Sequence, residues 1–142
     1  MKKVLCTTLL SLLLSSPTLA ESLHLVVILR NFGTDNCTLI KKVLIEGTLD
    51  KEKSFPYTLP ADGYWYQFSV TGNKTDASVT YQCGKYKKFT LTMGQYMKSN
   101  DKHSTIDAKM IDAVDVFEKH QTLEANPTEN RYTGTLEWDI TQ

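Results

Sequence analysis

The sequence contains few residues of the kinds that build reactive sites, with three cysteines and three histidines among 142 residues. It also has no excess of charge, since 16 Lys and Arg residues balance 16 Asp and Glu residues. Long basic runs are absent, which argues against a nucleic-acid partner, and a hydrophobic content of 41% argues against a disordered chain. The length suits a single domain.

Motifs for nucleophilic, metal-assisted and phosphate chemistry are also missing. The sequence has no G-x-S-x-G turn, no H-E-x-x-H pair, no calcium loop and no glycine-rich phosphate loop. His24 falls in an apolar segment, whereas His103 and His120 have carboxylates near them in the sequence. We therefore predict no catalytic residues, no metal and no cofactor, with an unrecognised enzyme site near His103 and His120 as an alternative.

The first twenty residues have the pattern of a secretory signal peptide. Lys2 and Lys3 precede a mostly apolar stretch over residues 4–14, and small residues precede the end at Ala20. The apolar stretch has about a dozen residues, whereas a membrane-spanning helix needs about 20. We expect cleavage after Ala20, a single mature domain of residues 21–142, and a secreted or periplasmic protein that does not span the membrane.

Removal of this segment changes the cysteine count and the charge. Cys37 and Cys83 are then the remaining cysteines, and export to an oxidising compartment predicts a disulfide between them. The alternative is a reactive or metal-binding pair, but neither cysteine has a His or a second Cys at ligand spacing. The mature chain has a net charge of −2, composed of +3 over residues 21–102 and −5 over residues 103–142. This division predicts a dipolar surface.

Strand-length apolar segments separated by turn residues recur from Leu23 onward, which is typical of an antiparallel β domain. In the segment after Gly63, the residues Tyr64, Tyr66 and Phe68 alternate with Trp65. Period two therefore predicts that these three residues face the core and that Trp65 faces away from it.

Residues 104–119 have apolar side chains at helical spacing and are predicted to form a helix. However, Val114 and Val116 flank Asp115 and could equally begin a strand. The predicted fold class is mainly β, namely a two-layer antiparallel β-sandwich with one short helix, stapled by the disulfide between Cys37 and Cys83.

Two surface features are the candidate binding residues. The first is Trp65, and the second is the densest basic stretch of the chain, which consists of Lys85, Tyr86, Lys87 and Lys88. Exposed aromatic rings beside lysines suit contact with an anionic lipid, a glycan or an acidic protein. Alternatively, the lysines protect an edge strand from aggregation, and Trp65 belongs to the core if a second layer covers it.

Four segments of the chain suggest a known scaffold, namely Val26–Asn31, Leu59–Gly63, Tyr66–Phe68 and Ser78–Tyr81. Together they resemble the sandwich scaffold of aegerolysin-type and actinoporin-type secreted proteins, and this resemblance implies a β-sandwich of a kind that binds membrane lipids. In addition, Tyr81-Gln82-Cys83 ahead of Phe89-Thr90-Leu91 is similar to the core of small periplasmic inhibitors of C-type lysozyme. The chain as a whole resembles small exported proteins of Gram-negative bacteria that have no assigned activity.

The leading hypothesis is a secreted, non-enzymatic binding module that contacts a host or envelope surface. The partner of the module would be a lipid, a glycan or a protein. One role that this hypothesis includes is a contribution to virulence. The alternatives are a protein inhibitor of a hydrolase such as lysozyme, and the unrecognised enzyme considered above.

Overall fold

The computed structural model describes residues 22–52, 54–99, 103–124 and 131–142. The predicted signal peptide, residues 1–20, lies outside the described residues. Across the described ranges there is no helix long and apolar enough to span a bilayer. These ranges form eight strands, which are β1 (Ser22–Asn31), β2 (Cys37–Leu49), β3 (Thr58–Leu59), β4 (Trp65–Cys83), β5 (Lys87–Met97), β6 (Ser104–Val114), β7 (Phe117–Glu124) and β8 (Arg131–Thr141).

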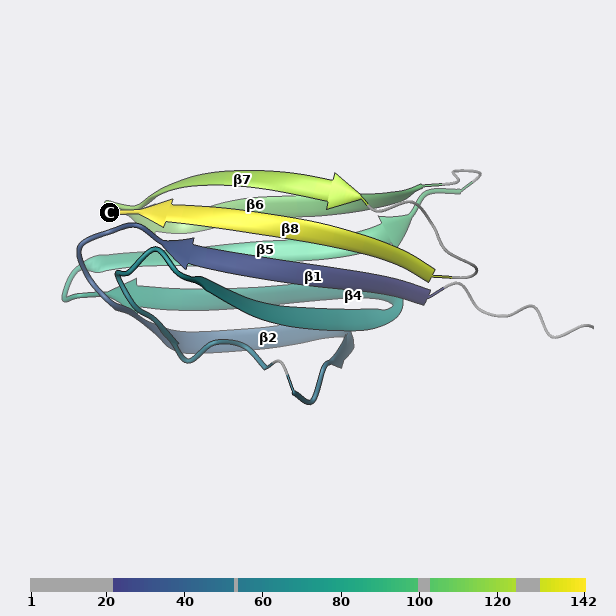
Figure 1. Cartoon of the computed structure of the whole chain (residues 1–142), viewed down its shortest axis with the longest axis horizontal. Helices are drawn as coiled ribbons and strands as arrows, with labels where there is room; N and C mark the ends of the chain where they lie inside the picture. The colour runs from purple at the N-terminus through teal and green to yellow at the C-terminus, as the bar shows by residue number, and fades with distance from the viewer. Residues whose placement is uncertain (1–21, 53, 100–102, 125–130) are drawn as a thin grey trace, which may run out of the picture.

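The sheet is organised around β4, whose 19 residues form two halves. The first half, Trp65 to Gly72, pairs with β1, and β8 and then β7 continue the sheet beyond β1. The second half, Thr75 to Cys83, pairs with β5 and with most of β2, and β6 pairs with β5. The end of β2, Thr48 and Leu49, pairs with Thr71 and Val70 of the first half. Figure 1 shows the two halves of β4 running in opposite directions, so the sheet folds over between them.

All eight strands belong to one continuous hydrogen-bonded sheet, so the predicted division into two separate sheets is not confirmed. The prediction that every pair is antiparallel is wrong at one place, because β1 and β8 are parallel. Parallel neighbours need a long connection, and here β1 and β8 come from opposite ends of the described chain. The mainly β class is confirmed.

The core contains side chains from both halves of the folded sheet. Alternate residues of β1 and β8, such as Leu25 and Trp138, are fully buried with Phe68 from the first half of β4 and Tyr81 from its second half. Burying a large apolar side chain stabilises the fold by about 1.5–3 kcal/mol. The Tyr81 hydroxyl donates a hydrogen bond to the Pro56 carbonyl at 2.6 Å, and burial raises the pKa of this phenol. The alternation of buried and less buried residues along β1 and β8 therefore determines which face of the sheet contacts the core.

The helix predicted over residues 104–119 is wrong, because β6 and the start of β7 occupy this segment. Ile106, Ala108 and Met110 pack against the core at strand spacing. Asp112 and Asp115 both have φ of 52°, in the left-handed region that Asp tolerates better than most residues. Asp112 lies in β6 at a register shift against β5, and Asp115 lies where the chain leaves β6 for β7. Burial of every second residue of this segment against the core stabilises the strand, and this tertiary contact outweighs the helical spacing of the apolar residues.

Candidate functional site at the aromatic end of the sheet

The strand register brings several turns together at one end of the sheet. This end contains the last residues of β1, β6 and β8 and the first residues of β2, β5 and β7, and in Figure 1 it is the left end, where the C-terminus is marked. The residue pairs nearest to it are Arg30 with Trp65, Cys37 with Cys83, Lys88 with Val114, and Phe117 with Thr141.

Exposed aromatic side chains gather at this end. Among the described residues, six aromatic side chains are more than half exposed, and all six lie in its turns or beside them: Phe32, Tyr57, Tyr64, Trp65, Tyr86 and Phe117. We call this region the aromatic end. Aromatic rings normally contribute to cores and interfaces, so six rings exposed at one end make this end the candidate contact surface.

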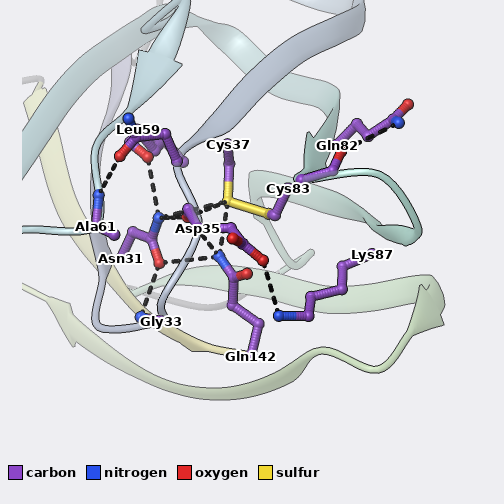
Figure 2. The surroundings of a disulfide bond; sticks show 12 residues. Asn31, Gly33, Asp35, Cys37, Leu59, Ala61, Gln82, Cys83, Lys87 and Gln142 are labelled. Atoms are coloured by element: carbon purple, nitrogen blue, oxygen red, sulfur yellow. Dashed lines mark hydrogen bonds and ion pairs between the residues drawn. A yellow bond between two sulfur atoms is a disulfide. The ribbon is translucent and has the colours of Figure 1, made fainter.

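A buried asparagine holds the turn that carries Phe32. The side-chain amide of Asn31 donates hydrogen bonds to the carbonyls of Asp35 and Leu59, both at 2.9 Å, and its oxygen accepts one from the Gly33 N–H at 2.9 Å (Figure 2). Asn31 itself is fully buried. One side chain therefore joins the end of β1, the turn and β3.

The same turn is also fixed by contacts to its Asp35. The carboxylate of Asp35 forms an ion pair with Lys87 and accepts a hydrogen bond from its Nζ at 2.9 Å (Figure 2). The main-chain carbonyl of Asp35 accepts a second hydrogen bond, from Gln142 Nε2 at 2.8 Å. The disulfide between Cys37 and Cys83 lies beside these groups and confirms the predicted pairing. The turn is therefore held by β5 and by the C-terminus as well as by Asn31.

Phe32 projects from this fixed turn into solvent. Its N–H donates to the Ile140 carbonyl at 2.8 Å, and the Arg30 guanidinium lies 5.8 Å from the centre of its ring. Gly63 has φ of 70°, and a Cβ there would lie 2.9 Å from the Phe32 ring. Only glycine adopts this conformation easily beside the ring, so the turns that carry Phe32 and Tyr64 pack closely.

The predicted basic stretch lies at the aromatic end, but its charges are unequal. Lys85 and Lys88 are exposed, whereas Lys87 is half-buried in its ion pair with Asp35. Lys88 is opposite Val114, the residue before Asp115 in the sequence. At this point the basic part of the chain, residues 21–102, therefore lies beside the acidic part, residues 103–142. Tyr86 is 74% exposed, with Lys85 Nζ 5.1 Å from its ring centre. Binding by this stretch stays a prediction.

Trp65 is 65% exposed at the first position of β4, and its binding role also stays a prediction. The expectation that Tyr64 faces the core is wrong, because Tyr64 precedes β4 and is 68% exposed. Its N–H donates to Asp62 Oδ1 at 2.8 Å in a turn, where the strand period does not apply. Phe32 and Phe117 were not predicted as site residues, and only the register reveals that they lie at the same end of the sheet as Trp65.

His103 and His120 do not form a common site. His103 precedes β6 at the far end of the sheet, whereas His120 is the fourth residue of β7, which begins at the aromatic end. The His120 ring contacts Trp138, with ring centres 4.8 Å apart, and its Nδ1 lies 2.9 Å from Glu118 Oε2. The enzyme alternative therefore loses the histidine pair on which it was based.

Comparison with known proteins supports the fold and leaves the family open. No protein-family model matches the chain, and no curated protein matches it. Among solved structures, the lipid-binding protein Nakanori superposes with a TM-score of 0.54 at 12% identity over 84% of this chain and 71% of Nakanori. The Xerocomus chrysenteron lectin XCL gives a TM-score of 0.41 at 12% identity over 83% of this chain and 97% of the lectin. The scaffold-level resemblance expected from the sequence is thus confirmed for the fold.

Proposed function

We propose that this protein is a non-enzymatic module that binds lipid bilayer surfaces through the aromatic end. The observation that carries the proposal is the gathering, within the described residues, of all six aromatic side chains that are more than half exposed. Tyr and Trp have an apolar ring and a polar group, which suits the boundary between lipid headgroups and acyl chains. Their placement on one end allows all of them to meet one surface.

The rigid turns support this role energetically. Asn31, Asp35 and the disulfide fix the Phe32 turn before any ligand arrives, so little conformational entropy is lost on binding. The exposed Lys85 and Lys88 add attraction to anionic headgroups, worth about 1 kcal/mol for each lysine near a charged membrane. Aromatic burial is then the main contribution, and charge adds to it.

Two further observations agree with the proposal. Nakanori, which shares the fold, is a lipid-binding protein by its own description. The disulfide agrees with a protein that works in an oxidising compartment, which fits the secreted or periplasmic location proposed from residues 1–20. A role at a host or envelope surface, including virulence, would follow from this location.

Vesicle co-sedimentation tests the proposal. The purified protein is mixed with phosphatidylcholine vesicles, with and without phosphatidylserine, and compared with Trp65→Ala and Phe117→Ala variants. We expect each substitution to weaken vesicle binding by about tenfold or more, because each removes a ring that lipid would bury. The control is Ile45→Ala on β2, which removes a side chain that is 60% exposed outside the aromatic end.

The result also separates the other partners. Failure of the unmodified protein to bind either kind of vesicle would overturn lipid binding. Inhibition of lysozyme by a molar excess of the protein, together with no vesicle binding, would favour the hydrolase inhibitor. Equal losses from Ile45→Ala and Trp65→Ala would show that the aromatic end has no special part in binding.

A further inference from the structure

The strands β4, β5 and β6 are neighbours in the sheet (Figure 1). A hollow of about 660 Å³, lined by residues of these three strands, lies on their outer face. Its centre is Gly94 of β5, which lies opposite Asp76 of β4 on one side and opposite Asp107 of β6 on the other. The neighbours of Gly94 along β5, Met93 and Gln95, are buried in the core, so Gly94 belongs to the outward face. The missing side chain of Gly94 leaves a gap between two carboxylates.

Residues of the same strand close the other two sides of the hollow. Thr92 and Tyr96, two positions before and after Gly94, both line the hollow. The Thr92 hydroxyl donates to the Lys109 carbonyl at 3.3 Å, and its oxygen still accepts a hydrogen bond. Tyr96 is half-buried and adds an aromatic surface. The side chains around Gly94 in the hollow are thus two carboxylates on the neighbouring strands and a hydroxyl and a phenol on the same strand.

Two lysines also line the hollow. Lys74 and Lys109 are exposed, and the four charged side chains that line the hollow, Asp76 and Asp107 among them, have a formal sum of zero. Lys74 Nζ also lies 3.5 Å from Glu46 Oε1, outside the lining, and keeps further N–H donors for a ligand. A site for a cation would have an excess of carboxylates, and a site for an anion an excess of lysines. Among the described residues, no group of three His, Cys, Asp or Glu side chains is placed to hold a metal ion. The equal number of carboxylates and lysines around the hollow favours an uncharged, polar ligand.

The hollow is a fixed part of the backbone arrangement. A Cβ at Gly94 would lie 2.8 Å from the Thr75 carbonyl oxygen, closer than real Cβ atoms come. Glycine therefore allows β4 and β5 to approach closely beside the turn between the two halves of β4. The volume lies within the range of about 300–1,000 Å³ that is usual for small-molecule sites.

From these features we infer that the hollow binds a neutral sugar residue of a glycan. Sugar hydroxyls donate hydrogen bonds to carboxylates such as Asp76 and Asp107, and hydroxyl oxygens accept them from ammonium groups such as Lys74 and Lys109. The ring of Tyr96 offers an apolar surface to the C–H face of a sugar ring. This site is separate from the aromatic end and does not depend on lipid binding there.

A glycan array printed with neutral and acidic glycans identifies the probe, and isothermal titration calorimetry with the free form of the strongest neutral glycan measures affinity. The full exported protein is compared with Asp76→Asn and Asp107→Asn variants, which keep the side-chain shape and remove the charge. We expect each to weaken glycan binding at least tenfold. The matched control is Asp112→Asn, the same change on β6 at a residue outside the hollow, and it should leave binding within twofold.

A second variant, Thr92→Tyr, fills the hollow with a larger side chain on a strand that tolerates it. We expect it to abolish binding, with the far-UV circular dichroism of the unmodified protein retained. The inference is overturned by an array without a neutral glycan hit, by unchanged affinity in both Asp variants, or by an equal loss in Asp112→Asn. Vesicle binding should be unchanged in all of these variants, so failure of this inference is distinct from failure of lipid binding.

Discussion

Cys37 and Cys83 lie directly opposite each other on the neighbouring strands β2 and β4, and a disulfide joins them beside the turn that carries Phe32. The bond closes a loop between residues 46 positions apart in the sequence. It therefore connects the first residue of β2 to the last residue of β4 and stabilises the base of the aromatic end.

Reduction of this disulfide should lower the free energy of unfolding. For a loop of this length, the chain-entropy model gives a loss of about 4 kcal/mol. Urea unfolding of the protein with and without dithiothreitol measures the loss. A Cys37→Ala/Cys83→Ala variant provides the same comparison without a reductant. Mass spectrometry that finds two free thiols in the exported protein, or an unchanged urea midpoint after complete reduction, would contradict the account.

Replacement of Asn31 by Ala should destabilise the protein by at least about 2 kcal/mol. The change leaves the buried Leu59 carbonyl without its amide donor and the Gly33 N–H without its acceptor, and it removes one of the two amide donors to the Asp35 carbonyl. Asn36→Ala is the matched control, because the exposed Asn36 side chain accepts a single hydrogen bond, from the Ala61 N–H at 2.9 Å, and its loss should cost less than about 1 kcal/mol. Equal unfolding midpoints for the two variants would show that Asn31 does not organise the turn.

The lysines of the 85–88 stretch should separate into two groups when each is changed to Glu. Lys85→Glu and Lys88→Glu should each weaken binding to phosphatidylserine vesicles by about fivefold, because their exposed charges are free to meet headgroups. Lys87→Glu places a second carboxylate beside Asp35, and it should lower stability by about 1 kcal/mol. Sedimentation with vesicles and urea unfolding measure the two effects. Identical behaviour of all three variants would contradict the distinction.

N-terminal sequencing of the exported protein tests the processing prediction. Cleavage after Ala20 predicts a mature chain that begins at Glu21 with a net charge of −2. A protein that keeps Met1 and stays in the cytoplasm would contradict both the signal peptide and the proposed location.

The sequence allowed prediction of those features that depend on local pattern. Period two correctly identified Phe68 as a core residue, and the cysteine count after removal of residues 1–20 correctly identified the disulfide. The 104–119 segment was misassigned because its apolar residues fit two periods, and only contact of Ile106 and Met110 with the core decides between them.

Features that depend on strand register could not be predicted. Phe32 and Phe117 are 85 positions apart in the sequence, and they lie at one end only because β1 and β7 both pair with β8. The outer hollow has the same origin, since Asp76, Gly94 and Asp107 form a row through two separate strand pairings. Local spacing carries no information about either arrangement.

Tryptophan fluorescence with brominated lipids tests lipid binding by the aromatic end most directly. The chain has two tryptophans, and Trp65 is 65% exposed whereas Trp138 is fully buried. With phosphatidylcholine vesicles that contain phosphatidylserine, we expect the emission of Trp65 to shift to shorter wavelength and to be quenched by bromine on the upper acyl chains. A Trp65→Phe variant should show neither change while it still sediments with the vesicles. Vesicle binding without quenching of Trp65, or no vesicle binding, would contradict the account.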